Sequence, residues 1–101
     1  MTITEEVVKR VWEKGTIVAG ADSSAWRQDE CTAWIHWESY GRVDEELGYG
    51  WEVDRIRPVS EGGGDELSNL RPLHWKNNRG KQAGRLVRIV VSSGNRNVLA
   101  R

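Results

Sequence analysis

Five polar side chains in the second half of the chain have the types and spacing used in phosphate chemistry. Asp54 lies late in an apolar, β-favouring stretch, and Asn69 follows fifteen residues later. His74 and Asn78 are four residues apart and would share one face of a helix, with Lys81 one turn further on. A carboxylate from a strand and an amide oxygen from a facing helix can hold one hard divalent cation, with water and a substrate phosphate completing its coordination. The pattern suggests cleavage of a phosphodiester.

The sequence around these residues predicts a strand pair, a Gly-rich loop and a helix. Residues 31–41 and 51–59 are rich in β-favouring side chains and are expected to pair as antiparallel strands. Residues 60–69 contain three consecutive glycines, and without a P-loop lysine they favour a plain connection over a phosphate cradle. The helix is expected to begin near Pro72 or Leu73, because proline is tolerated in a first turn.

The N-terminal part of the chain predicts a helix followed by a loop. Residues 1–15 place apolar side chains on one helical face, with Thr2 or Thr4 as the N-cap and Gly15 as the stop. Residues 16–29 mix short apolar pieces with Gly, Asp and Ser, which favours a loop.

The length of the chain and its C-terminal pattern predict one domain of the α+β class over residues 1–101. Its core would lie in residues 31–83. Residues 85–101 alternate as a strand or hairpin does, with a turn at Ser93–Asn95.

The aromatic and sulfur-containing residues predict a packed core without a structural zinc ion. The chain has six Trp and no Phe, so Trp12, Trp34, Trp51 and Trp75 are expected to fill the core. The single cysteine, Cys31, cannot close a disulfide within the chain or form a paired-cysteine zinc site, and a buried thiol is expected.

The formal net charge is zero, but the charges are unevenly distributed. Residues 1–53 carry five Lys/Arg and eleven Asp/Glu, whereas residues 54–88 carry eight and four. The basic segment could form a phosphate-binding face, or the two segments could neutralise one another in the fold. No apolar run approaches the roughly 18 residues of a membrane span and no signal-peptide pattern is present, so we expect a soluble, cytoplasmic protein without a membrane partner.

The stretch from Gly50 to Lys81 resembles the HNH (ββα-metal) endonuclease family, in particular its small stand-alone bacterial and phage members. The resemblance extends more loosely to residues 31–41 and covers about half the chain. The matching positions fall in place without a gap; they are Asp54, Pro58, Gly62, Gly63, Asp65, Leu67, Asn69, Leu70, Pro72, Leu73, His74, Trp75, Asn78 and Lys81.

The resemblance implies a role for each matching polar residue. Asp54 and Asn78 would be ligands of a divalent metal ion, Mg²⁺ or Mn²⁺. Asn69 would tie the loop to the backbone and orient the catalytic base. Lys81 would approach phosphate or pair with an acid of the scaffold. His74 falls where zinc-binding members carry a cysteine, and a structural hydrogen bond is expected there.

The chain departs from the family at Arg55, which occupies the position of the general base. A positioned base contributes on the order of 10²–10⁴ in rate, and an arginine has no lone pair to offer at neutral pH. Like charges about 5 Å apart repel by roughly 3 kcal/mol at an effective dielectric constant of about 20. Arg55 is therefore expected to weaken both metal binding and cleavage.

Two roles are open for the Arg55 side chain. It could bind phosphate together with Arg57, Arg79 and Lys81, because a guanidinium matches the geometry of phosphate oxygens. It could instead form a salt bridge with Asp54, Glu52 or another acid.

Cleavage would then need a substitute base. The only imidazoles in the chain belong to His36 and His74. His36 lies in the strand expected to pair with the one that carries Asp54, so either histidine could face the attacking water.

Three functions follow from these expectations. The first is a degenerate HNH-like protein that binds nucleic acid, DNA rather than RNA, or a nuclease complex, without efficient cleavage. The second is an active metal-dependent endonuclease that nicks DNA with a substitute base. The third is an inhibitor, of the phage anti-defence kind, that reuses the fold to bind a protein nuclease or defence complex through its acidic N-terminal half.

Overall fold

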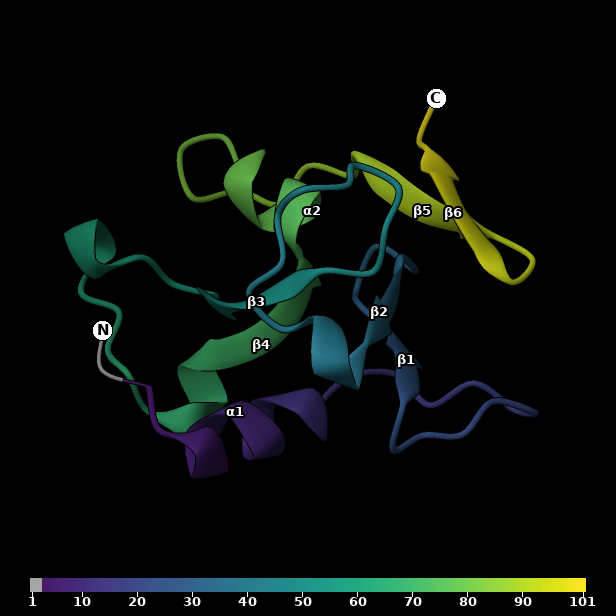
Figure 1. Cartoon of the computed structure of the whole chain (residues 1–101). Helices are drawn as coiled ribbons and strands as arrows, with labels where there is room; N and C mark the ends of the chain where they lie inside the picture. The colour runs from purple at the N-terminus through teal and green to yellow at the C-terminus, as the bar shows by residue number, and fades with distance from the viewer. Residues whose placement is uncertain (1–2) are drawn as a thin grey trace.

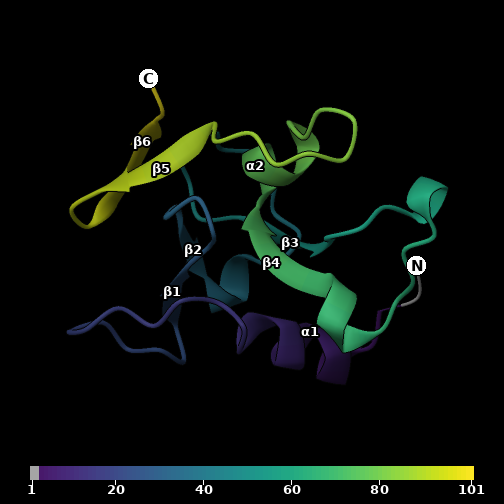
Figure 2. The ribbon, with the colours of Figure 1, turned by 180° about the vertical axis from the view of Figure 1, so that it is seen from behind.

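A computed structural model describes residues 3–101 and has the expected α+β composition (Figure 1). These residues form two α-helices, three separate two-stranded antiparallel sheets and three short 3-10 turns. The two α-helices lie at opposite ends of strand β4, Leu70–His74, which runs between them in both ribbon views (Figure 2).

Helix α1, Glu5–Trp12, confirms the predicted N-terminal helix but is shorter. Thr4 is the N-cap, and its Oγ1 accepts a hydrogen bond of 3.2 Å from the backbone N–H of Val7. Thr2, the alternative cap, lies outside the described residues. The helix ends before the expected stop at Gly15, and its inward face buries Val8, Val11 and Trp12.

The predicted strand pairing is wrong. Strand β1, Trp26–Gln28, pairs with β2, Trp34–His36, so the expected loop over residues 16–29 ends in a strand. Strand β3, Trp51–Arg55, pairs with β4 and not with β2. Each sheet has only two strands, so β4 keeps a free edge. A free edge tolerates a proline, so Pro72 can lie in a strand although it predicted the start of a helix.

Helix α2, Trp75–Arg79, begins later than predicted because Pro72 and Leu73 belong to β4. His74 is the N-cap: its Nδ1 accepts a hydrogen bond of 3.1 Å from the backbone N–H of Lys76. Strand β4 therefore leads directly into α2, so β3, β4 and α2 form one strand–strand–helix unit.

The predicted C-terminal hairpin is confirmed. Strand β5, Val90–Ser93, pairs with β6, Arg96–Leu99. The turn falls at the expected place, and Gly94 has a φ of 63°, which a glycine adopts without strain.

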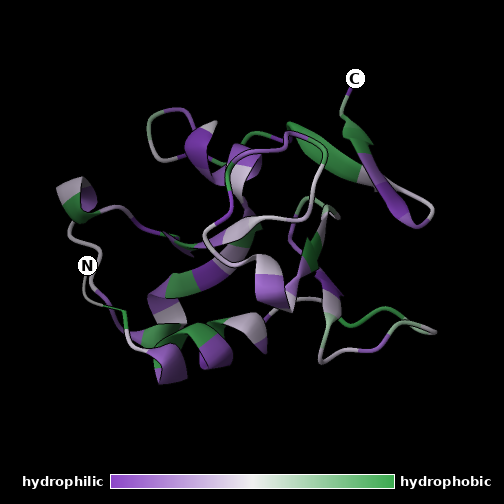
Figure 3. Ribbon diagram, in the orientation of Figure 1, coloured by the Kyte–Doolittle hydropathy of each residue, from purple (hydrophilic) through white to green (hydrophobic). Residues whose placement is uncertain are grey.

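The hydrophobic core lies between α1 and the β3–β4 pair. The rings of Trp12 and Trp51 pack with centroids 5.3 Å apart, and Trp37 lies 5.8 Å from Trp12. Trp34 is also buried, as predicted, whereas Trp75 is only partly buried. Figure 3 shows apolar and polar residues alternating around α1 and an apolar stretch along β5.

Cys31 is fully buried, as predicted. Burial raises the pKa of its thiol to about 11, so the thiol is protonated and unreactive at neutral pH.

Within residues 3–101, neither helix has the length and apolar character needed to cross a bilayer.

Candidate functional site

The centre of the candidate site is Asp54, whose side chain is only 4% exposed. It stands opposite Arg71 in the β3–β4 register, and the Arg71 Nε donates to its Oδ2 at 2.7 Å. The Lys81 Nζ, from the segment after α2, donates to its Oδ1 at 2.5 Å. Each carboxylate oxygen is thus paired with a cation. Lys81 meets an acid of the scaffold, one of the two roles that the resemblance implied.

A second acid, Glu52, lies two residues before Asp54 and meets the residues of α2. The Asn78 Nδ2 donates to its Oε1 at 3.1 Å, and the Arg79 NH2 group donates to its Oε2 at 2.9 Å. Burial by itself would raise the pKa of Glu52, but the bonds from Arg79 and Asn78 and the charge of Arg79 outweigh it and lower the pKa. Glu52 therefore stays ionised and fixes α2 against β3.

Arg55 forms a salt bridge with an acid, which was one of the two predicted roles. The acid is neither Asp54 nor Glu52 but Asp65 from the Gly-rich loop, at 2.7 Å from Nε and 2.6 Å from the NH2 group. The Arg55 side chain is 24% exposed. Its hydrogen bond lowers the pKa of Asp65, so both partners stay charged at neutral pH.

Asn69 ties the Gly-rich loop to the end of β3, as the resemblance implied. Its Oδ1 accepts from the Arg57 backbone N–H at 2.8 Å, and its Nδ2 donates to the carbonyls of Arg57 at 3.0 Å and Gly64 at 2.8 Å. The loop passes so close that a Cβ on Gly63 would lie 1.7 Å from the Arg57 carbonyl oxygen. Asn69 thereby fixes the start of the loop that carries Asp65.

His74 is in a structural position. Its ring is fully buried, and its Nε2 lies 2.8 Å from the Gly48 carbonyl oxygen while Nδ1 accepts from Lys76. These partners require a neutral ring with its proton on Nε2, and burial lowers the pKa accordingly. Both nitrogens are engaged, so His74 has no free lone pair with which to act as a base.

His36 lies in a different sheet from Asp54. It belongs to β2, where its ring packs against Trp26 with centroids 4.5 Å apart. Its Nδ1 accepts from the backbone N–H of Glu38 at 3.3 Å. The pairing of β2 with β3 was the reason to expect His36 near the site, and that pairing is wrong.

The donors do not fit a resident divalent cation in this arrangement. Both oxygens of Asp54 are ion-paired, and Asn78 directs its amide nitrogen toward Glu52. Residues 3–101 contain no cluster of three His, Cys, Asp or Glu side chains that could hold a metal ion. The two acids of this face, Glu52 and Asp54, are outnumbered by the three cations that pair with them, which are Arg71, Arg79 and Lys81.

Of the four predicted phosphate-binding residues, only Arg57 is exposed without an acidic partner in the described part of the chain. The turn Gln82–Arg85 packs beside it, since a Cβ on Gly84 would lie 3.0 Å from Pro58 Cγ. Arg85 and Arg88 are exposed as well, and no salt bridge in residues 3–101 engages them. Within the basic segment, these three arginines are exposed and form no salt bridge among the described residues.

Several salt bridges join the acidic and basic segments of the chain, as one of the two readings of the charge pattern anticipated. They are Glu30–Arg71 at 2.9 Å, Glu46–Lys76 at 3.1 Å and Glu52–Arg79 at 2.9 Å. The sequence did not predict Arg71 as a partner of Asp54, because this pairing follows from the β3–β4 register.

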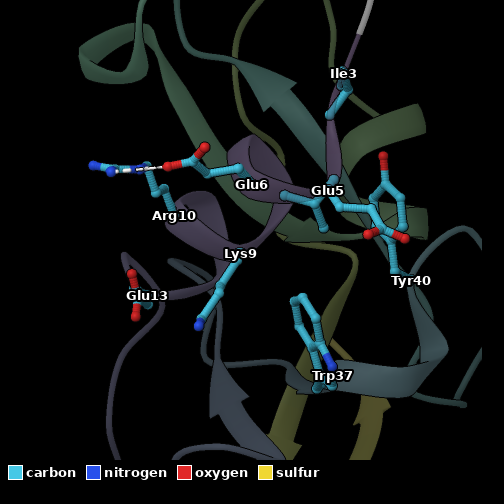
Figure 4. Close-up of a pocket in the computed structure, with 9 residues that line it drawn as sticks. Ile3, Glu5, Glu6, Lys9, Arg10, Glu13, Trp37 and Tyr40 are labelled. Carbon is cyan, nitrogen blue, oxygen red and sulfur yellow. Dashed lines mark hydrogen bonds and ion pairs between the residues drawn. The ribbon is translucent and has the colours of Figure 1, made fainter.

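A pocket away from these residues lies between α1 and the segment around Trp37 and Tyr40 (Figure 4). It is an open groove of about 980 Å³. Charges of both signs line it, and Glu6 is paired with Arg10 at 3.1 Å. The groove has no single sign of charge that would select a partner.

Comparisons with protein-family models, with curated proteins and with solved structures find no match to this chain.

Proposed function

We propose that this protein is a degenerate HNH-type nuclease that binds the phosphate backbone of DNA and does not cleave it. The observation that carries the proposal is the state of Asp54, which is neutralised from both sides by Lys81 and Arg71. The β3–β4–α2 unit and the loop tie made by Asn69 support the HNH assignment.

The absence of a usable base supports the loss of cleavage. Arg55, in the position of the base, is bound to Asp65 and cannot accept a proton from water. His74 uses both ring nitrogens in the scaffold, and His36 lies in another sheet. Binding without cleavage is the function that these side chains support.

The exposed arginines support binding to a nucleic-acid backbone. Arg57, Arg85 and Arg88 follow or flank the strand–strand–helix unit and face solvent. If each neutralises one phosphate of duplex DNA, the slope of log Kd against log salt would be about 2.7, because each contact contributes roughly 0.9.

Cleavage is tested by incubating supercoiled plasmid with the protein and Mg²⁺ or Mn²⁺, beside Arg55→His and Asp54→Asn variants. We expect no nicking by the unaltered protein. Robust nicking that disappears in Asp54→Asn would overturn the proposal and favour the active endonuclease.

Binding is tested by fluorescence anisotropy with a labelled duplex over a series of salt concentrations. Removing Arg57, Arg85 or Arg88 singly to Ala should lower the salt slope by about 0.9 each. Arg96→Ala, an exposed arginine of the C-terminal hairpin, is the matched control and should leave the slope unchanged. If the protein neither cuts nor shows salt-dependent binding, the proposal fails and a protein partner, such as a nuclease complex, becomes the better candidate.

A further inference from the structure

The Lys81 ammonium is bound by two oxygen atoms next to Asp54. Its Nζ donates to Asp54 Oδ1 at 2.5 Å and to the Arg55 carbonyl oxygen at 3.0 Å, and its side chain is 13% exposed. The segment that carries it is closely packed, since a Cβ on Gly80 would lie 2.0 Å from Ile89 Cδ1. The Lys81 ammonium therefore donates hydrogen bonds to two oxygen atoms at a site that is mostly shielded from water.

Arg71 holds the other oxygen of Asp54 and is itself held. Its NH1 group donates to Glu30 Oε2 at 2.9 Å, and its side chain is 10% exposed. A divalent ion that approached Asp54 would have to expel one of these cations and then remain beside the other. Both steps oppose binding, because like charges repel strongly where water is scarce.

We infer that the Lys81 ammonium is the resident cation of the Asp54 carboxylate and takes the place of a divalent metal ion. The site is then complete without metal, and the metal affinity that the family resemblance implies is lost through Lys81 and Arg71, not through Arg55. The inference goes beyond the proposed function, because it concerns the occupancy of Asp54 and holds whether or not the protein binds DNA.

Lys81→Met tests this inference, because methionine keeps an unbranched apolar side chain and removes the charge. We expect the variant to bind Mn²⁺ at least about tenfold more tightly than the unaltered protein, since removing one adjacent positive charge lowers the repulsion. Mn²⁺ should also raise the Tm of the variant and leave that of the unaltered protein unchanged, because a ligand stabilises only a state that binds it. Mn²⁺ binding is followed by electron paramagnetic resonance of the free ion, and Tm by circular dichroism.

Two control variants make the result specific. Lys76→Met removes the lysine of α2, which pairs with Glu46, and should bind Mn²⁺ no better than the unaltered protein. Adding Asp54→Asn to Lys81→Met should abolish the gain. If Lys81→Met does not fold, Lys81→Gln removes the charge and keeps a hydrogen-bond donor toward Asp54, and the same gain is expected.

One-to-one Mn²⁺ binding by the unaltered protein that Asp54→Asn removes would overturn the inference. So would a folded Lys81 variant with no gain in affinity. These titrations contain no nucleic acid, so their outcome is independent of the DNA-binding experiment.

Discussion

Asp29 and Asp54 are both buried, at 3% and 4% exposure, yet their carboxylates are stabilised in different ways. Asp54 is paired with two cationic side chains. Asp29 has no cationic partner in residues 3–101 and accepts four N–H bonds instead. The donors are the backbone N–H groups of Cys31, Ala33 and His74, each at 2.9 Å, and the Asn77 Nδ2 at 3.0 Å.

The difference separates a structural carboxylate from one that can exchange its partners. The three backbone donors of Asp29 can leave only if the chain unfolds locally. Lys81, at Asp54, can move its ammonium by rotating its own side-chain bonds. The surroundings of Asp54 can therefore adapt when one partner is replaced, whereas those of Asp29 cannot.

Asn77 extends the region around Asp29 to the C-terminal hairpin. Its Oδ1 accepts from the backbone N–H groups of Ile89 and Val90, and its Nδ2 donates to Val90 O as well as to Asp29. The aromatic residues and the single cysteine predicted a packed core without a structural zinc ion. Alongside the tryptophans, this buried hydrogen-bond network performs that connecting role.

The largest effect is expected from Asp29→Ala. It orphans four donors, and each buried unsatisfied donor costs about 1–3 kcal/mol, so the free energy of unfolding should fall by about 4 kcal/mol or more. Chemical denaturation followed by circular dichroism measures the change. A loss of under about 1 kcal/mol would mean that Asp29 is not the anchor of this region.

A smaller loss, about 3 kcal/mol, is expected from Asp54→Ala, because removing one partner of a buried pair typically costs roughly 3–5 kcal/mol and Lys81 can swing into water. Unlike the loss of stability at Asp29, the loss at Asp54 should be recovered in part when its cationic partners are also replaced by apolar residues. The test compares the denaturant midpoint of Asp54→Ala with that of a triple variant. The triple variant carries Asp54→Leu, Arg71→Met and Lys81→Met. If the triple variant is less stable than Asp54→Ala alone, the pairing at Asp54 contributes more than neutralisation.

The smallest expected effect is a pH dependence of the free energy of unfolding. It arises from His74, whose backbone N–H is one of the donors to Asp29. Burial lowers the pKa of the His74 ring in the folded state, so the unfolded chain takes up a proton first as the pH falls. The free energy of unfolding therefore has its full value above about pH 6.5. At lower pH it should decrease, by at most about 1.4 kcal/mol per pH unit.

Urea denaturation at pH 7.5 and pH 5.5 measures this dependence. His36→Gln should keep the pH dependence, and His74→Gln should reduce it. Equal slopes in the unaltered protein and in His74→Gln would assign the effect to other groups.

The sequence predicted the features that depend on neighbouring residues. Thr4 caps α1 and Gly94 turns the last hairpin, while the family resemblance implied that Asn69 binds backbone groups of its own loop. Each involves partners at most twelve residues apart, or a conformation of a single residue. Such local signals are readable without knowledge of the strand order.

The features that the sequence did not predict depend on register. Pro72 predicted the start of a helix, although it belongs to β4. Without β4, the sequence predicted the wrong partner for β3. With β4 missing, Arg71 could not be placed opposite Asp54. The partner of Arg55, Asp65, lies across a Gly-rich loop whose path depends on Asn69 and Gly63 and not on any repeating pattern.

The close packing of Trp12, Trp37 and Trp51 determines what spectroscopy will report. Their rings lie 5.3 to 6.1 Å apart in the core beneath α1, so intrinsic fluorescence and the exciton signal in circular dichroism will follow the docking of that helix. Trp75 lies outside this cluster, on α2, where the Lys76 Nζ is 5.4 Å from the centroid of its ring.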